Sequence, residues 1–313
     1  MVKRVSYKDI GLRYALSPFY EPVLRIKPGE RIIVEVQDAS SGQIRHRGDV
    51  RDRSKVPYGN PVVGPIYIEG CGEGDSLAVR IEDIKPSINL GVTYFSGFTG
   101  SYFIGDHAIG FAGVEIPSAA RICRIEEDLV YFSDRLAIPY RPMIGTIGTA
   151  PKPELYGMSS SLSVGPNGGN MDIPDITVGA EVYLPVFHEG GLLYIGDAHA
   201  VQGDGEISGT AVEMPAEITL TVTVLKGKSI GWPRVKLNDE IMCLVSTSPG
   251  RDLRDAIKTA FTELIRWMEE DYGIDKWEAL MLLGQVGRIR VGNLWSVAAK
   301  VNVKYLKPYQ KTG

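Results

Sequence analysis

The stretch Gly196-Asp197-Ala198-His199-Ala200-Val201-Gln202-Gly203-Asp204-Gly205-Glu206 places three carboxylates, one imidazole and one carboxamide within eleven residues. It directly follows the apolar run Leu192-Leu193-Tyr194-Ile195, which is typical of a buried strand. Side chains two residues apart on a strand project to the same face. Asp197 and His199 are therefore predicted to point the same way near the end of a strand.

An aspartate and a histidine in this arrangement can give one oxygen and one nitrogen ligand to a divalent metal ion such as Zn²⁺. Gly203 and Gly205 permit a sharp turn, which would bring Asp204 and Glu206 back toward the same point. The alternative is a glycine-rich hairpin whose aspartates bond the turn backbone, with His199 as a half-buried core residue. Two ligands do not make a metal site, so the spacing alone leaves both interpretations open.

A second pair of carboxylates follows another expected strand. Apolar residues alternate over 32–36, and this strand runs directly into Asp38. Glu35 and Asp38 thus form a second carboxylate pair at a strand end, and Asp197 and His199 would need just such a partner to complete a metal or acid/base site. The alternative is that Glu35 faces solvent and Asp38 caps a turn.

Residues 144–174 are rich in turn-forming residues, and we expect a long loop there, neither helix nor strand. Loops of that length inside a compact domain are usually functional or disordered. The loop contains Gly168-Gly169-Asn170-Met171-Asp172, whose glycines permit close approach of a ligand and whose carboxamide can both donate to and accept from an amide. The alternative is a glycine turn capped by the asparagine. The predicted substrate-binding residues are Gly169, Asn170, Asp172 and Gln202.

The C-terminal part has a different pattern. Apolar residues recur at helical spacing from Leu253 to Met268, with a stop at Gly273, and a second helix is predicted to start at Asp275. A last strand is expected over 297–305. We therefore predict a mainly β fold, a distorted barrel or sandwich, over 1–226. An α+β portion follows over 227–313, and both portions could form one continuous fold.

Composition, net charge and cysteine spacing argue against several classes of protein. The 313 residues are 44% hydrophobic and 23% charged, and the net charge of -4 gives no reason to expect nucleic acid or an anionic membrane as a partner. No apolar signal core or membrane-length run is present, so we expect a cytoplasmic protein. The three cysteines are odd in number and widely spaced, which argues against a disulfide framework and against a Cys-x-x-Cys metal site. No G-x-S-x-G, H-E-x-x-H or P-loop motif occurs.

The segment 196–206, followed by Gly209-Thr210-Ala211 and Glu213, resembles the signature block of the acetamidase/formamidase family. Four further blocks agree with it in order: Asp38-Ala39-Ser40-Ser41-Gly42-Gln43-Ile44, Asn60-Pro61-Val62-Val63-Gly64-Pro65-Ile66-Tyr67-Ile68-Glu69-Gly70, Gly145-Thr146-Ile147-Gly148-Thr149-Ala150-Pro151 and Gly168-Gly169-Asn170-Met171-Asp172. One departure is Asn167, where many relatives carry His before the two glycines.

The resemblance implies hydrolysis of a small carboxamide, such as formamide or acetamide, to a carboxylate and ammonia, with a divalent metal for which Zn²⁺ is the expected ion. From ligand type and strand-end position we expect Asp38, Asp197 and His199 as metal ligands. Glu206 is the expected proton carrier and Asp204 its catalytic neighbour.

Two alternatives stay open. A metal-free hydrolase of cyclic amides would use Asp204 and Glu206 as its acid and base. A non-enzymatic β-rich module would use the same groups to bind a small metabolite. A homo-oligomer, a dimer or larger, is expected for a cytosolic enzyme.

Overall fold

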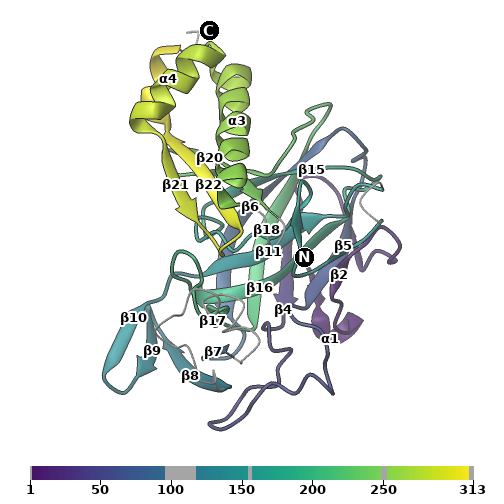
Figure 1. Ribbon diagram of the computed structural model, residues 1–313. Coiled ribbons are helices and arrows are strands. Elements are labelled where there is room, and N and C mark those ends of the chain that lie inside the picture. The colour runs from purple at the N-terminus through teal and green to yellow at the C-terminus, as the bar shows by residue number, and fades with distance from the viewer. Residues whose placement is uncertain (1, 96–117, 154–156, 248–251, 310–313) are drawn as a thin grey trace.

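The computed structural model describes residues 2–95, 118–153, 157–247 and 252–309. Two large β-sheets form the body of the protein, and a pair of helices lies at one end (Figure 1). The first sheet has nine strands, in the spatial order β1 (Lys3–Ser6), β4 (Arg31–Val36), β18 (Ala216–Leu225), β6 (Ser76–Pro86), β15 (Glu181–Pro185), β19 (Arg234–Leu237), β20 (Glu240–Ser246), β22 (Ser296–Asn302) and β21 (Arg288–Val291).

The second sheet has eleven strands and carries most of the signature residues. Its main path runs β10 (Leu136–Pro139), β9 (Leu129–Ser133), β8 (Ala119–Glu126), β7 (Leu90–Phe95), β17 (Val212–Glu213), β16 (Leu193–Val201), β11 (Met143–Thr149), β14 (Gly168–Asn170) and β13 (Val164–Gly165). Two strands lie off that path: β5 (Val62–Ile68), which pairs with β16, and β3 (Leu24–Ile26), which pairs with β5.

Smaller elements complete the described chain. These are α1 (Tyr7–Ile10), the two-stranded sheet of β2 (Ala15–Leu16) and β12 (Ser159–Ser160), and the 3₁₀ turns η3 (Val303–Tyr305) and η4 (Lys307–Tyr309).

The main hydrophobic core draws side chains from both sheets. In β18, Ile218, Leu220 and Val222 are fully buried, whereas the threonines between them are not. That alternation follows from the two-residue period of a strand with one face on the core. Among the described strands neither sheet closes on itself, because the nine-stranded sheet ends at β1 and β21 and the other path at β10 and β13. The prediction of a mainly β fold is confirmed, in the form of two open sheets.

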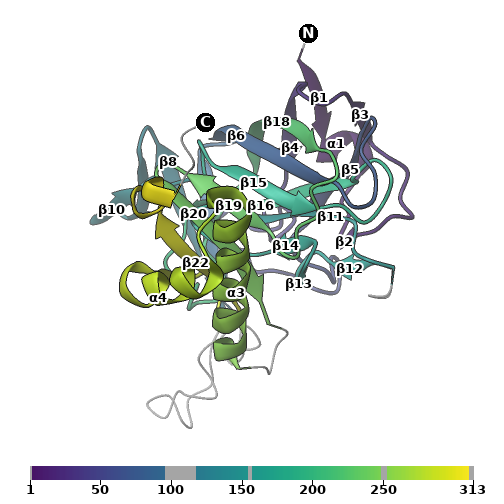
Figure 2. The same ribbon diagram turned by 90° about the horizontal axis from the view of Figure 1, so that it is seen from above.

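The predicted C-terminal helices are both present. The first, α3 (Leu253–Tyr272), ends at Gly273, whose φ of 70° is the left-handed value that glycine adopts at little cost. The second, α4 (Lys276–Val286), begins after Asp275, whose side chain accepts from two backbone amides of the first turn. Both helices pack with β20 and β22 around a second core cluster. Because β19 pairs with β15, the C-terminal strands extend the nine-stranded sheet (Figure 2).

The expectation of a long loop over 144–174 was wrong. The chain there forms β11, β12, β13 and β14, and every residue of β11 is buried. A β-carbon added to Gly148 would lie 2.7 Å from the carbonyl oxygen of Asn167, so glycine lets β14 approach β11 closely. The glycines that made this segment resemble turns instead permit tight strand packing.

Candidate functional site

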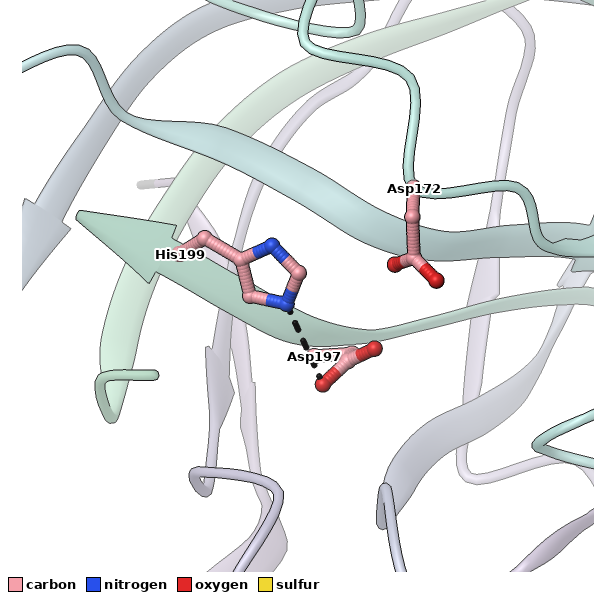
Figure 3. Close-up of side chains that lie close together, drawn as sticks. All are labelled: Asp172, Asp197 and His199. Carbon is pink, nitrogen blue, oxygen red and sulfur yellow. Dashed lines mark ion pairs between the residues drawn. The ribbon is translucent and has the colours of Figure 1, made fainter. Parts of the chain in front are cut away.

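Asp197 and His199 lie on β16, where that strand crosses the centre of the eleven-stranded sheet. Both side chains are buried, and Asp197 Oδ1 lies 3.5 Å from His199 Nε2 (Figure 3). The pairing of β16 with β17 shifts register between His199 and Val201, and Asp197 has a φ of 57°. The strand is therefore irregular where it presents these two groups, and such departures are common beside functional sites.

Asp172 reaches the same point from the segment that follows β14. Figure 3 shows its carboxylate directed toward the strand that carries Asp197 and His199. Gly145 of β11 lies directly against all three side chains. A β-carbon there would be 2.5 Å from Asp172 Oδ1, 2.8 Å from Asp197 Oδ2 and 2.9 Å from His199 Cε1. Glycine at 145 is thus needed for the three groups to meet.

In Asp172 and in Asp197, one of the two carboxylate oxygens accepts hydrogen bonds from side-chain amides. Asp172 Oδ2 accepts from Asn170 Nδ2 at 2.5 Å and from Asn293 Nδ2 at 2.8 Å. Asp197 Oδ2 accepts from Asn60 Nδ2 at 2.7 Å. In both residues the other oxygen, Oδ1, is buried and has no hydrogen-bond partner among the described residues.

Glu213 of β17 repeats this arrangement on the other side of the imidazole. Its Oε1 accepts from the backbone amide of Ala211 at 2.9 Å, and its buried Oε2 has no hydrogen-bond partner in the described part of the chain. That free oxygen lies 3.1 Å from His199 Nε2.

The hydrogen bonds of Gln202 fix the tautomer of His199. Gln202 Nε2 donates to the carbonyl oxygens of Asp172 at 2.6 Å and Gly292 at 3.3 Å, so its Oε1 faces His199 Nδ1 at 2.9 Å. A carboxamide oxygen can only accept, and Nδ1 must therefore carry the proton. In the neutral imidazole, Nε2 then presents its lone pair to the carboxylates. A partner on the remote ring nitrogen commonly orients a metal-binding histidine in this way.

Four buried atoms of this cluster thus have no hydrogen-bond partner among the described residues. They are Asp172 Oδ1, Asp197 Oδ1, Glu213 Oε2 and His199 Nε2. Ligand atoms of Asp172, Asp197 and His199 lie within 4.8 Å of one another, as do those of His199, Glu206 and Glu213. Three carboxylate oxygens and one imidazole nitrogen form a donor set that fits a divalent cation.

Burial and mutual repulsion dominate the electrostatics of this cluster. Burial first, and then the charge of neighbouring Asp197, raises the pKa of Asp172 to about 7. Burial likewise raises the pKa of Glu213 to about 7, although His199 opposes the shift. The pKa of Glu206 lies well above its ordinary value because of burial and the charge of Asp172. Burial would lower the pKa of His199, but the Glu213 and Asp197 carboxylates outweigh it and raise that pKa well above the usual value.

So many buried carboxyl groups are unfavourable unless they are protonated or paired with positive charge. Within the described residues, the ion pairs of Asp172, Asp197, Glu206 and Glu213 include no lysine or arginine. A bound cation would offset their repulsion directly.

Positive backbone φ angles are frequent at this cluster. Eight non-glycine residues in the described chain have a positive φ, and four of them belong to this cluster or contact it. These four are Asn60, Asp172, Asp197 and Glu206. Strained backbone of this kind persists where the surrounding structure holds it, and it gathers at functional sites.

Two of the three predicted metal ligands lie together in the structure. It brings Asp197 and His199 together, but it does not bring Asp38 to them. Asp38 Oδ1 accepts from the backbone amide and hydroxyl of Ser40, and its Oδ2 pairs with Arg45 at 2.6 Å. This fully buried carboxylate therefore stabilises a turn and a salt bridge. Its strand-end partner, Glu35, is bound by Ser6, Lys8 and Arg4.

The two predicted catalytic residues, Glu206 and Asp204, differ in burial. Glu206 is 9% exposed and joins the cluster, whereas the Asp204 side chain is 58% exposed and pairs with Arg290 at 3.5 Å. The turn of Gly203 and Gly205 therefore brings one of the two carboxylates inward and leaves the other at the surface.

The predicted substrate-binding residues are bonded within the protein. Asn170 Oδ1 accepts from Thr146 Oγ1 at 2.6 Å and from Asn60 Nδ2 at 2.9 Å, while its amide nitrogen donates to Asp172. Gly169 packs against the carbonyl oxygen of Ser163, which a β-carbon would approach to 2.1 Å. Asp172 faces Asp197 and His199, and Gln202 is hydrogen-bonded to the imidazole.

Sequence reasoning missed four residues of the site. Glu213 lies in the signature block, but no spacing pattern gives it a role, and Thr146 and Asn60 lie in blocks that carry only the family resemblance. Asn293 carries no local signal, because it enters from the turn between β21 and β22, which is 121 residues from Asp172.

The fold and the site define a β-rich protein of two sheets. Its candidate site is a buried cluster of carboxylates around one histidine. The model of the acetamidase/formamidase family matches residues 16–162 and 161–291. The chain belongs to the acetamidase/formamidase family, as the sequence resemblance indicated. Asn167, which precedes the two glycines of the fifth block, donates its side-chain amide to the carbonyl oxygen of Thr149.

Solved structures of similar proteins share the fold over nearly the whole chain. An acetamidase from Yersinia enterocolitica is 37% identical with a TM-score of 0.87, over 98% of this chain and 93% of that one. A predicted acetamidase/formamidase from the thermophile Thermoanaerobacter tengcongensis is 30% identical with a TM-score of 0.88, over 99% and 98% of the two chains.

A curated relative, the acetamidase of Mycolicibacterium smegmatis, is 29% identical over 258 residues. That alignment covers 64% of this chain and 63% of the relative, so this chain spans less than two thirds of that protein.

Proposed function

We propose that this protein hydrolyses small linear carboxamides, such as formamide or acetamide, to the carboxylate and ammonia. One observation carries the proposal: four buried donor atoms in the cluster around His199 have no hydrogen-bond partner among the described residues, and the other polar atom of each of those side chains is hydrogen-bonded. Such a set is preorganised for a cation and not for a neutral metabolite. The family and its acetamidase and formamidase members supply the substrate class.

The residues that would hold the cation are Asp172, Asp197, His199 and Glu213. Their mixture of oxygen and nitrogen donors suits Zn²⁺. When bound, the cation would lower the pKa of a water molecule toward ~7 and polarise the amide carbonyl. The chain's own contribution is to hold the four donors at fixed positions through Asn60, Asn293, Gln202 and the backbone of Ala211.

Glu206 is the proposed proton carrier. Its carboxyl group lies with His199 and Glu213 and is 9% exposed. Burial and the charge of Asp172 raise the pKa of Glu206, which favours the protonated form that departing ammonia needs as a proton donor. A general acid or base of this kind typically contributes a factor of about 10² to 10⁴ in rate.

Asn170 and Gln202 are assigned to the protein framework instead of to the substrate. Every polar atom of the Asn170 side chain already has a protein partner, and both ends of the Gln202 carboxamide are bonded. A direct contact with substrate would break one of these bonds. Their proposed role is to orient Asp172 and His199.

The proposal is tested by ammonia release from formamide and acetamide, with Glu206→Gln compared with Glu127→Gln. Glu127 is a matched control because it is also a turn glutamate with a positive φ, but it is exposed and remote from the cluster. We expect turnover by the wild type and by Glu127→Gln, and a loss on the order of 10² or more in Glu206→Gln. Full activity in Glu206→Gln would remove this residue from the chemistry, and no turnover of either amide would remove the substrate class.

The metal-free alternative predicts different results in the same assay. An acid and base pair of Asp204 and Glu206 would lose activity in Asp204→Asn as well and would be indifferent to a chelator. The exposed position of Asp204 favours the cation proposal.

Within the described residues, no helix combines the length and apolar character needed to span a bilayer. A cytoplasmic location and a homo-oligomeric state remain predictions.

A further inference from the structure

The turn between β21 and β22 enters the cluster from the C-terminal part of the chain. Asn293 in this turn is 5% exposed, and its Nδ2 donates to Asp172 Oδ2 at 2.8 Å and to the carbonyl oxygen of Asn170 at 3.1 Å. Its Oδ1 accepts from the backbone amide of Trp295 at 3.0 Å. One side chain thus shapes its own turn with its oxygen and holds Asp172 with its nitrogen.

The backbone of this turn is also tied to both segments that carry site residues. Gly292 O accepts from Gly205 N at 2.8 Å and from Gln202 Nε2 at 3.3 Å. A β-carbon at Gly292 would lie 2.6 Å from the carbonyl oxygens of Met171 and Asp172. The turn is therefore packed directly onto the chain at Asp172 and joined to the turn that precedes Glu206.

Ion pairs anchor the rest of the hairpin to the same segment. Asp175, three residues after Asp172, is buried and lies 3.2 Å from Arg290 of β21 and 3.2 Å from Lys300 of β22. Because these contacts come from both strands of the hairpin, the position of Asn293 relative to Asp172 is fixed from either side. Such fixed support is what a metal ligand needs for productive geometry.

We propose that Asn293 is a positioning residue, which binds Asp172 Oδ2 so that Asp172 Oδ1 is presented to the cation. The inference rests on the cation site proposed above and extends it to the C-terminal hairpin. An amide is suited to this position because it donates to a carboxylate without adding charge. The other donor to Asp172 Oδ2, Asn170, belongs to the same segment as Asp172, so Asn293 is the donor that ties the carboxylate to a separate part of the fold.

The test replaces asparagine with aspartate at two places on the same hairpin. Asn293→Asp keeps the acceptor for Trp295 N but replaces the donor to Asp172 with a carboxylate oxygen. Asn302→Asp is the matched control, because Asn302 Oδ1 accepts from Lys304 N at 2.9 Å in the same i to i+2 manner at the far end of β22. Asn293→Ser is a second variant, with a shorter hydroxyl and no added charge.

Zn²⁺ affinity of the metal-free proteins is measured by competition with a chromophoric chelator, together with thermal unfolding and amide turnover. We expect the Kd for Zn²⁺ to rise about 10- to 100-fold in Asn293→Asp and to rise in Asn293→Ser, with no change in Asn302→Asp. Turnover should recover in the Asn293 variants as Zn²⁺ approaches saturation, which a misfolded site would not allow.

Wild-type Zn²⁺ affinity in both Asn293 variants would overturn the inference while leaving the cation site intact. An equal loss of affinity in Asn302→Asp would also overturn it, because the effect would then come from the hairpin's stability. Failure of the wild type to bind Zn²⁺ would overturn the cation site and this inference together.

Discussion

Replacing Gly145 with alanine adds a single methyl group at the point where the cluster meets β11. The added carbon would stand 2.5 Å from Asp172 Oδ1, 2.8 Å from Asp197 Oδ2 and 2.9 Å from His199 Cε1. All of these separations are shorter than an ordinary van der Waals contact of 3.4 Å or more. The three side chains belong to a buried, hydrogen-bonded cluster, so they cannot move away freely.

Relief of these contacts requires a displacement of roughly 0.5 to 1 Å at the donor atoms. A misplacement of about 1 Å can reduce turnover about 10²-fold, and overpacking of a core costs typically ~1 to 3 kcal/mol of stability. We therefore expect kcat/KM for formamide to fall on the order of 10²-fold in Gly145→Ala. The free energy of unfolding should fall by only ~1 to 3 kcal/mol, so the variant stays folded.

The assay combines ammonia release, Zn²⁺ affinity and urea unfolding, with Gly72→Ala as the control. A β-carbon at Gly72 meets nothing within 4 Å, and its φ lies outside the positive region, so we expect that variant to resemble the wild type in all three measurements. Wild-type affinity and turnover in Gly145→Ala would refute the packing of the three side chains against β11.

Three further predictions concern groups outside the cluster. Burial raises the pKa of Cys71 to about 12 and that of Cys123 to about 11, and all three cysteines are free and buried. A thiol reagent at pH 8 should therefore leave the native protein unmodified and label all three cysteines after denaturation. Rapid labelling of a native thiol would contradict this prediction. Burial would raise the pKa of Asp75, but hydrogen bonds from one lysine and two backbone amides outweigh it and hold that pKa below the ordinary value. Asp75→Asn should therefore lower the free energy of unfolding by ~1 to 3 kcal/mol at pH 7. In urea titrations, this difference in free energy from the wild type should shrink as the pH falls below ~4. A difference that is independent of pH would refute the stabilising role of the ionised Asp75 carboxylate. Asp38→Asn should weaken the pairing with Arg45 and lower thermal stability while leaving Zn²⁺ affinity near that of the wild type, whereas a large rise in Kd would return Asp38 to the ligand set.

The sequence was most informative where a single segment carries both the periodic pattern and the chemistry. Asp197 and His199 were predicted to share one face of a strand, and the structure brings their side chains together at 3.5 Å. The C-terminal helices were also predictable, because Asp275 and Gly273 are end signals that act within a few residues.

The partners of individual polar side chains were not predictable in the same way. Asp38 ends its strand with a carboxylate, but no local pattern shows that Arg45 and Ser40 take up both of its oxygens. The β11 segment looked like a loop because its glycines are common in turns, whereas here one of them makes room for the cluster. The role of Asn293 depends on how the C-terminal hairpin packs against the middle of the chain, which one sequence does not reveal.

The buried cluster is proposed to hold a divalent cation on which amide hydrolysis depends. The most direct test is ammonia release from formamide and acetamide before chelation, after chelation and after addition of Zn²⁺, with elemental analysis of the protein at each stage. We predict that activity disappears as the metal is removed and returns as Zn²⁺ is restored, and that His199→Ala neither retains the metal nor recovers activity. Undiminished turnover by protein shown to be free of metal would contradict this role of the cluster.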